Sequence, residues 1–259
     1  MKNEQVAFLY FSQSMNIEKR RGLVSLSDQC RDIILGSLLG DGSLKMNAGY
    51  ANARFSFRHS SVQKDYFNWK VEMLSEISSN VHTFVQKPDG YSKNEKLRYQ
   101  SAALSVLTDI FKLTCKGGKL NIRRKWLNIM QPLSLAIWWQ DDGSIIGGGR
   151  KGVLCTDGFD EKSVHLLAQY LQNVWGVYAH VGKIGPRRDS VKTEYFRLWL
   201  GTEELKKFLR IILPHIHKSM IKKVYLKYKD PELQQRWISE IKSATGFSDN
   251  DIVQPLWRT

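Results

Sequence analysis

Cysteine is scarce in this chain of 259 residues, which contains 3. Cys30, Cys115 and Cys155 lie far apart in the sequence and are odd in number. This pattern argues against a disulfide framework and against a zinc knuckle. The 6 histidines form no metal-binding spacing such as H-E-x-x-H, and the glycines at residues 147–149 are not followed by the Lys-Ser/Thr of a phosphate-binding loop.

Long hydrophobic runs are also missing from the sequence. No window approaches eighteen uninterrupted apolar residues, so we expect neither a membrane span nor a membrane partner. Residues 1–21 lack the apolar core of a signal peptide, and secretion is therefore not expected. Hydrophobic residues make up 42% and charged residues 25% of the chain, which is typical of a globular protein.

Acidic residues are outnumbered by basic ones. Lysine and arginine total 39 and aspartate and glutamate total 25, which gives a formal net charge of +14. The excess positive charges repel one another in a compact protein unless a polyanion neutralises them. Nucleic acid is the most common polyanion, because its phosphates release counterions when lysine and arginine bind. The alternative is a generically basic protein with no such partner.

The sequence contains an internal repeat. Residues 40–44 (GDGSL) recur as residues 141–145 (DDGSI), a separation of 142 − 41 = 101 residues. Residues 119–124 (KLNIRR) recur as residues 218–223 (KSMIKK), 218 − 119 = 99 residues later. Matches in the same order at nearly one spacing indicate two copies of a unit of ordinary domain size.

Hydrophobic periodicity predicts the same order of elements in both copies, an α/β fold of two αββαββα repeats with antiparallel strands. We expect an N-terminal extension at 1–26, a first repeat at 27–128, a second repeat at 129–242 and a C-terminal tail at 243–259. The predicted helices are 33–39, 62–77, 104–113, 133–140, 161–174, 203–212 and 219–228. The predicted strands are 53–58, 81–86, 95–100, 152–156, 177–184 and 193–200.

Two nine-residue segments carry a family resemblance. Residues 34–42 (ILGSLLGDG) resemble the LAGLIDADG motif of homing endonucleases, and residues 135–143 (LAIWWQDDG) resemble its second copy. Two copies about one domain apart, each opening an α/β unit in a basic chain, make the resemblance specific. It covers residues 27–241 and implies a monomer in which two pseudo-symmetric repeats form a DNA-binding saddle of two antiparallel sheets.

The resemblance also implies an activity. It implies a Mg²⁺-dependent, site-specific endonuclease that cuts both strands of a long double-stranded DNA target across the minor groove, leaving short 3′ overhangs. An intron-borne mobile element is the implied origin, with location in a mitochondrion or chloroplast, or in bacterial cytoplasm. Two alternatives stay open. One is an RNA maturase that helps its host intron RNA fold. The other is a DNA-binding protein that has lost cleavage, which the presence of both motif acids disfavours.

Asp41 and Asp142 are the acids that match between the two motifs, each at the C-terminal end of its predicted helix. Phosphodiester hydrolysis uses a divalent metal, and hard cations take carboxylate oxygens. Two carboxylates at two helix C-termini repel each other, so the arrangement favours a cation. We expect Mg²⁺, with Mn²⁺ or Ca²⁺ able to substitute in binding, at Asp41, Asp142 and the preceding Gly40 and Asp141. The alternative is two Asp-Gly turns that end helices.

The motif helices are expected to form the interface between the repeats. Gly36 and Gly40 lie four residues apart, on one helical face, where they permit close approach of a second backbone. Ile137 and Asp141 occupy the matching positions of the second motif, so the interface should be asymmetric. The tryptophans at 138–139 are predicted to be part of the core, because a motif helix is expected to be buried.

Alternating polar residues in the predicted strands form the expected DNA surface. A sheet can lie in the major groove, where arginine reads guanine and glutamine reads adenine. An ordinary solvated sheet face is the alternative. The predicted base-contacting side chains are Arg54, Ser56, Arg58, Lys96, Arg98, Gln100, Tyr195, Arg197 and Trp199. Lys183, Arg187 and Arg188 flank a turn and are expected to contact phosphates.

Lys119 and Lys218 occupy equivalent places ahead of the last helix of each repeat. In the resembling family, a basic residue near this place enters the active-site pocket, where a lysine can stabilise the developing phosphorane charge. A phosphate clamp is the alternative role for both lysines.

Three further residues are pocket candidates. Ser60 lies near the position where the family places a polar pocket residue, and Thr156 and Asp157 are the second-repeat candidates. Their alternative interpretation is as helix caps that precede Val62 and Glu161.

Overall fold

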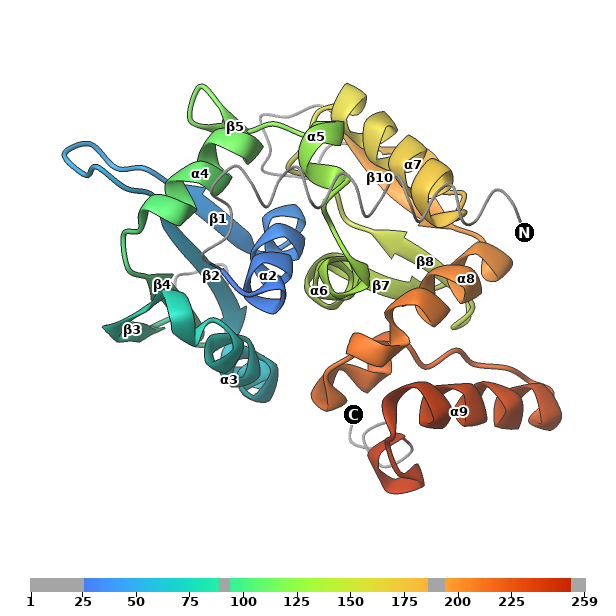
Figure 1. Ribbon diagram of the computed structural model, residues 1–259. Coiled ribbons are helices and arrows are strands. Elements are labelled where there is room, and N and C mark those ends of the chain that lie inside the picture. Colours follow the sequence, from blue (N-terminus) through green and yellow to red (C-terminus); the bar gives the residue numbers. More distant parts are fainter. Residues whose placement is uncertain (1–25, 89–93, 186–193, 253–259) are drawn as a thin grey trace, which may run out of the picture.

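The computed structural model describes residues 26–88, 94–185 and 194–252 (Figure 1). Arg187 and Arg188, which were predicted to contact phosphates, lie outside these residues. In the described part of the chain, two four-stranded antiparallel sheets lie on either side of a central pair of helices. None of the described helices combines the length and the apolar character that crossing a bilayer requires.

The first repeat follows the predicted order of elements, and its sheet has the strand order β1-β2-β4-β3. Its elements are α2 (Asp28–Leu39), β1 (Gly42–Lys45), β2 (Arg54–Ser60), α3 (Lys64–Met73), β3 (Ser78–Gln86), β4 (Lys96–Ser101) and α4 (Ser105–Thr114). A short hairpin of β5 (Cys115–Lys116) and β6 (Lys119–Leu120) and the one-turn helix α5 (Arg124–Leu127) lead to the second repeat.

The second repeat has the same order of elements, with the strand order β7-β8-β10-β9. Its elements are α6 (Pro132–Asp142), β7 (Gly143–Ile146), β8 (Lys151–Leu154), α7 (Glu161–Trp175), β9 (His180–Ile184), β10 (Tyr195–Leu200) and α8 (Thr202–Ile212). The two αββαββα repeats are therefore confirmed. The short strands β1 and β7 follow the motif helices directly, and the sequence pattern did not locate them.

The chain beyond α8 differs from the prediction. Instead of a regular helix over 219–228, it forms two short 3₁₀ helices, η3 (Leu213–His215) and η4 (Lys218–Lys223). These are followed by α9 (Pro231–Thr245), which packs against η3 outside the repeat unit (Figure 1). The predicted boundary between residues 242 and 243 falls inside α9.

Local signals set the ends of the helices. Ser27 Oγ accepts a hydrogen bond from the Cys30 N–H at the start of α2 (3.1 Å). Pro132 occupies the first turn of α6, where its missing N–H leaves no hydrogen bond unmade. The Asp160 carboxylate accepts a first-turn N–H of α7. Helices α2, α6 and α7 thus begin at residues that suit the first turn of a helix.

Alternation in the first sheet gives it one buried and one open face. Phe57 in β2 pairs with Tyr99 in β4, and both are buried against α3 and α4. Directly paired residues point to the same side of a sheet, and their neighbours along the strand point to the other side. Arg58 and its partner Arg98 therefore lie on the face away from the helices, which we call the open face.

The second sheet is built in the same way. Leu198 and Leu200 of β10 are buried, and helices α7 and α8 pack against this sheet (Figure 1). Alternation puts Arg197 and Trp199 on its open face. Lys183 pairs with Phe196, so it lies on the helix side of the sheet edge, apart from the open-face residues.

The motif helices α2 and α6 pack closely at the centre of the molecule. A Cβ atom at Gly36 would overlap the carbonyl oxygen of Ser134 and lie 2.9 Å from the Cβ of Ile137. A Cβ atom at Gly40 would lie 2.5 Å from the Cβ of Asp141. The predicted close and asymmetric interface is thus confirmed, with matching positions of the two motifs facing each other. Trp138 and Trp139 are fully buried, as predicted.

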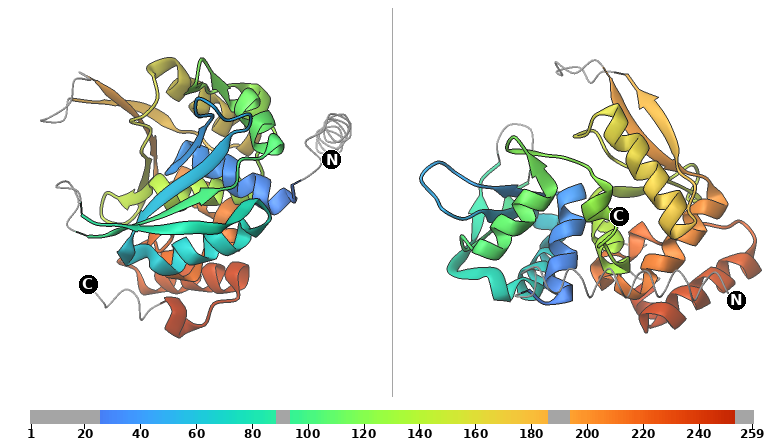
Figure 2. Two further views of the ribbon diagram at one scale, coloured as in Figure 1. Left: turned by 90° about the vertical axis from the view of Figure 1, so that its left-hand side faces the viewer. Right: turned by 45° about the horizontal axis from the view of Figure 1, so that its top comes forward.

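Both long hairpins reach toward the same side of the molecule. In the left view of Figure 2, β3–β4 and β9–β10 project to the same side of the molecule. Each open face adjoins a motif acid, because Asp41 lines a hollow with residues of the first face and the charge of Asp142 acts on Arg197 of the second.

Candidate functional site

The C-terminal ends of α2 and α6 bring the two motif acids to the centre of the molecule. Helix α2 ends at Leu39, Gly40 is its C-cap, and Asp41 follows. Helix α6 ends at Asp142 itself. The Asp41 side chain is 39% exposed, so its carboxylate is accessible at the surface between the sheets.

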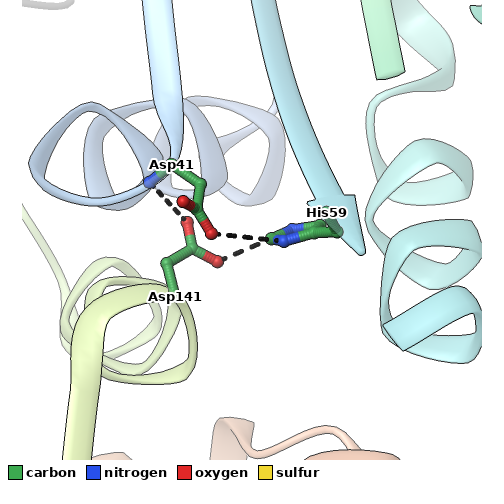
Figure 3. Close-up of side chains that lie close together, drawn as sticks. All are labelled: Asp41, His59 and Asp141. Atoms are coloured by element: carbon green, nitrogen blue, oxygen red, sulfur yellow. Dashed lines mark hydrogen bonds and ion pairs between the residues drawn. The ribbon is translucent and has the colours of Figure 1, made fainter. Parts of the chain in front are cut away.

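A histidine lies between two acids of the site (Figure 3). His59 Nδ1 is 3.2 Å from Asp41 Oδ2, and His59 Nε2 is 3.8 Å from Asp141 Oδ1. The histidine is 3% exposed. Sequence reasoning missed this residue. The alternation of strand β2 could have found it, because His59 continues the buried series begun by Phe55 and Phe57.

The side chain of Asp141 is fully buried and has cationic and hydroxyl partners from the first repeat. Lys70 Nζ lies 3.0 Å from Asp141 Oδ1 and 2.9 Å from Oδ2, and the Tyr66 hydroxyl donates to Oδ1 at 3.0 Å. The Asp41 N–H also donates to Asp141 Oδ2, at 3.4 Å. Asp41, His59 and Asp141 offer ligand atoms within 4.8 Å of one another, but a cation there would compete with Lys70 for Asp141.

Lys70 was not predicted, although the sequence held a signal. Its helix was predicted with an apolar face that includes Tyr66, and Lys70 lies four residues further on, on the same face. The lysine is 0% exposed. A buried lysine needs a charged partner, and the partner is the extra acid of the second motif.

Asp142 lies in an unfavourable environment for a carboxylate. Burial, followed by the negative charges of Asp41 and Asp141, raises its pKa to about 7. Burial also acts to raise the pKa of Asp41, but contact with His59 and the charges of Lys70 and Lys223 outweigh it, and this pKa is lowered. The two motif acids, although equivalent in sequence, therefore differ in electrostatic environment.

Lys223 of η4 contacts the backbone at the end of α6. Its Nζ donates to the carbonyl oxygens of Gln140 (2.6 Å) and Asp141 (3.1 Å). Burial lowers its pKa, although the charges of the surrounding acids oppose this shift. Lys223 belongs to the repeated segment identified in the sequence, five residues after Lys218.

The two predicted pocket lysines have other positions. Lys218 Nζ forms an ion pair with Asp251 at 2.6 Å, and its side chain is 60% exposed. Lys119 lies in the hairpin strand β6 and is exposed. Their catalytic role stays a prediction, but the lysine of this repeated segment that contacts the motif helix is Lys223.

Arg197 lies on the open face of the second sheet and is engaged by an acid. Its Nε and Nη2 donate to the two carboxylate oxygens of Asp157, each at 2.6 Å. The Thr156 hydroxyl donates to the Phe196 carbonyl oxygen at 2.6 Å. Because Asp160 caps α7, the interpretation of Thr156 and Asp157 as its caps is wrong.

Ser60 fits its alternative interpretation. Its Oγ accepts a hydrogen bond from the Val62 N–H at 3.4 Å, at the start of the 3₁₀ helix η1 (Ser61–Gln63). The predicted cap is confirmed, and a pocket role for Ser60 stays a prediction.

The partners of these groups leave two carboxylates in excess. Lys70 neutralises Asp141, and Arg197 neutralises Asp157. The Asp142 carboxylate has no hydrogen bond or ion pair to any residue that the structure describes, and Asp41 has only neighbouring His59 as a side-chain partner there. One carboxylate from each repeat is thus available, and the donor set fits a hard divalent cation.

A hollow of about 550 Å³ connects Asp41 with the open face of the first sheet. Five of the six predicted base-contacting residues of this half line it, all except Lys96. Its lining residues are Asp41, Ser43, Lys45, Asn47, Arg54, Ser56, Phe57, Arg58, Arg98 and Gln100. A basic groove that ends at a motif acid has the form expected of a binding surface for a phosphodiester backbone.

Two curated proteins are similar in sequence to most of this chain. Protein RecA of Mycolicibacterium fallax is 28% identical over 218 residues, which cover 79% of this chain and 48% of that protein. The cytochrome b mRNA maturase bI2 of Saccharomyces cerevisiae is 24% identical over 229 residues, which cover 85% of this chain and 52% of that protein. The chain therefore spans about half the length of these curated relatives.

Similarity in fold extends to a solved structure. The homing endonuclease I-WcaI, bound to its DNA recognition sequence, superposes with a TM-score of 0.67 and 19% identity over 78% of this chain and 88% of that chain. The model of the LAGLIDADG DNA endonuclease family matches residues 31–208, from the first motif helix into α8. With both motif helices packed at its centre between two matching sheets, this chain belongs to the LAGLIDADG DNA endonuclease family.

Proposed function

We propose that this protein is a site-specific homing endonuclease that cuts both strands of a long duplex DNA target in a metal-dependent reaction. One observation carries the proposal. Asp41 and Asp142, at matching positions of the two repeats, lie at the adjoining ends of α2 and α6 without a lysine or arginine partner among the described residues. Two cuts need one acid for each strand, and one chain supplies both.

The chemistry follows from the donor set. A divalent cation held by Asp41 and Asp142 would polarise the scissile phosphate and activate water for attack. Lys223 donates from beside the end of α6, where its ammonium can stabilise negative charge that develops on the phosphate. We infer Mg²⁺ as the physiological ion, with Mn²⁺ or Ca²⁺ able to support binding.

The sheets would hold the duplex over these acids. Both open faces lie on the side of the molecule where the long hairpins project (Figure 2). The charge of +14 favours a polyanion at this surface. With two repeats in one chain, the protein needs no second copy to reach both strands, and we expect a monomer.

Selection from a randomised duplex DNA library tests the proposal. The enriched duplex is then incubated with the protein and Mg²⁺, Mn²⁺, Ca²⁺ or a chelator. We expect a double-strand break with Mg²⁺, binding without cleavage in the chelator, and a single enriched sequence. If a duplex is enriched but none of the three metal ions supports its cleavage, the protein is a DNA-binding protein and the proposed endonuclease activity is refuted.

A maturase is the second candidate function. The maturase bI2 relative is similar over 85% of this chain, and a basic sheet can serve RNA as well as DNA. Splicing of a transcript that carries the host intron, with and without the protein, separates the two functions. An intron-encoded origin, which we also propose, predicts that the preferred DNA target is the intron-less insertion site.

A further inference from the structure

The open face of the first sheet is cationic. Strand register places Arg58 beside Arg98 in the central pair of strands, and Lys45 beside Arg54 at one end. Lys96 lies two residues from Arg98 along β4, on the same side. Phe84, paired with Arg98 on the edge strand, is the one large apolar side chain of this face among the described residues.

The open face of the second sheet carries more large apolar side chains than that of the first. Register places Trp199 between Val153 and His180, and Tyr195 beside Ile184. Ser144, beside Val153, is a further polar residue of this face. Ile146 lies at the end of this face, beside Lys151. The matching strands of the two repeats therefore carry different chemistry.

The cations of the second open face are few within the described strands. They are Lys151 and Arg197, and Arg197 is held by both carboxylate oxygens of Asp157. Arg98, at the matching place in the first sheet, has no acidic partner among the described residues, and its Nη2 donates to Gln100 Oε1 at 3.4 Å. The two arginines that match in sequence are therefore not equivalent as readers of bases.

Trp199 lies at the centre of the apolar side chains of the second open face. A Cβ atom at Gly182 would overlap its indole ring, so the glycine makes room for the ring to lie across the neighbouring strand. Val153 is 5% exposed although it does not belong to the connected hydrophobic core. Its cover comes from the open-face side, where Trp199 is its direct partner. This apolar surface is built into the sheet and is half-exposed.

We propose that the two sheets read their half-sites by different chemistry. The first sheet reads guanine-rich sequence through arginine donors to the N7 and O6 acceptors, and the second sheet reads thymine-rich sequence through apolar contact with the 5-methyl groups. Each base edge supplies the matching feature in the major groove, where the thymine methyl is the apolar group. The inference rests on the proposed function, because it takes duplex DNA as the ligand.

Two base analogues separate these contacts without changing the protein. Deoxyuridine lacks the 5-methyl group of thymine, and 7-deazaguanine lacks the N7 acceptor of guanine. The duplex enriched from the randomised library is prepared with each analogue, in one half-site at a time, and its affinity for the wild-type protein is measured. We expect a loss of about fourfold for each contacted methyl and of about tenfold for each contacted guanine.

The pattern of losses decides the inference. Uracil should weaken binding in one half-site and deazaguanine in the other, with at most one uracil-sensitive step beside Phe84 in the guanine-rich half. Equal sensitivity of both half-sites to both analogues would overturn the inference while leaving the endonuclease intact. If the DNA library yields no enriched duplex, or if the protein binds RNA and not duplex DNA, the proposed function fails as well.

Variants assign each half-site to its sheet. Trp199→Ser should abolish the uracil effect in the thymine-rich half-site, and Arg98→Met should abolish the deazaguanine effect in the other. Tyr178→Ser is the matched control, because Tyr178 is an exposed aromatic residue that precedes β9. It should leave both effects unchanged. If Trp199→Ser removes the deazaguanine effect and Arg98→Met removes the uracil effect, the inference is overturned. The analogue measurements on the wild-type protein test the inference even if Trp199→Ser does not fold.

Discussion

Lys70 and Asp141 form a fully buried ion pair between the two repeats, with Lys70 Nζ 2.9 Å from Asp141 Oδ2. The pair explains why the second motif carries an acid where the first has Gly40. The two positions face each other, and a Cβ at Gly40 would lie 2.5 Å from that of Asp141. Between the two helices there is room for one side chain at this level. Asp141 occupies it, and its carboxylate binds Lys70 and accepts a hydrogen bond from the Asp41 N–H.

Breaking this pair should destabilise the protein strongly. Lys70→Met leaves Asp141 buried without a counter-charge, which costs about 3–5 kcal/mol. The double variant Lys70→Met, Asp141→Asn should recover part of the loss. Urea unfolding of the three proteins measures both effects. Lys242→Met is the control, because its ion pair with Asp249 is exposed and such pairs contribute about 0.2–1 kcal/mol. Similar losses in Lys70→Met and Lys242→Met would contradict the assignment.

Removing either motif carboxylate should stop double-strand cleavage. Asp41→Asn and Asp142→Asn each lose a ligand for the metal, whereas DNA affinity should stay equal or rise because repulsion at the site decreases. Gel-shift and cleavage assays on each variant test this. Asp160→Asn is the matched control, since asparagine caps a helix as well as aspartate does. Near-normal cleavage by both motif variants would refute the metal assignment.

Lys223→Met should slow cleavage by about two to three orders of magnitude, with a smaller change in affinity. Lys223 Nζ lies beside the end of α6, whereas Lys218 pairs with Asp251 on the surface. Lys218→Met and Lys119→Met should therefore change the rate little. Strand-resolved single-turnover rates at saturating enzyme measure this. If Lys218→Met or Lys119→Met cleaves slowly while Lys223→Met cleaves at the normal rate, the catalytic role belongs to the lysines predicted from the sequence.

Stability should depend on pH through Asp32, which lies near the start of α2, whereas Asp41 follows the end of that helix. Burial raises its pKa to about 7, and the nearby charge of Asp28 adds to this, although Arg31 and the hydroxyl of Ser134 oppose it. A carboxyl with a raised folded-state pKa stabilises the protein at low pH. That contribution is lost as pH rises from about 4 to about 7, and it amounts to about 4 kcal/mol.

Asp32→Asn should remove this dependence. Urea unfolding at about pH 5 and about pH 8 would show a larger difference for the wild type than for the variant, in which Asp142, whose pKa is also raised to about 7, still contributes. The Ser134 hydroxyl, 3.2 Å from Asp32 Oδ1, can bond an amide oxygen as well, so the variant should fold. Parallel pH profiles for the two proteins would refute the role of Asp32.

The paired arginines should behave differently. Arg98→Ala should relax base preference in one half-site, because Arg98 lies on the open face. Arg197→Ala should instead slow cleavage, since it removes the guanidinium that binds Asp157, whose negative charge acts on Asp142. Base-by-base cleavage profiling separates the two effects. Arg210→Ala, which breaks the exposed pair with Glu240, is the control for loss of an arginine. If Arg197→Ala relaxes base preference, Arg197 contacts bases, as the sequence predicted.

The repeats, the motif helices and the open faces of the sheets can be predicted from the order of the amino acids alone. These features depend on local periodicity. Alternation in residues 54–60 marks one buried side, and the small Gly36 and Gly40 mark a surface where another helix approaches. The matching of Asp41 with Asp142 needs no more than alignment of the two copies. Each inference uses residues that are neighbours along the chain or equivalent within the repeat.

Which charged groups meet depends on packing between segments that are far apart in the sequence. Lys70 and Asp141 lie 71 residues apart in the sequence, and Lys223 meets the carbonyl oxygen of Gln140 across 83 residues. Equivalent places in the repeat did not identify such pairs, because the extra acid of the second motif breaks the symmetry. The same is true of Arg197, which shares its sequence context with Arg98 but has Asp157 as its partner. Periodicity specifies which side of an element is buried, whereas long-range packing selects the partner it meets there.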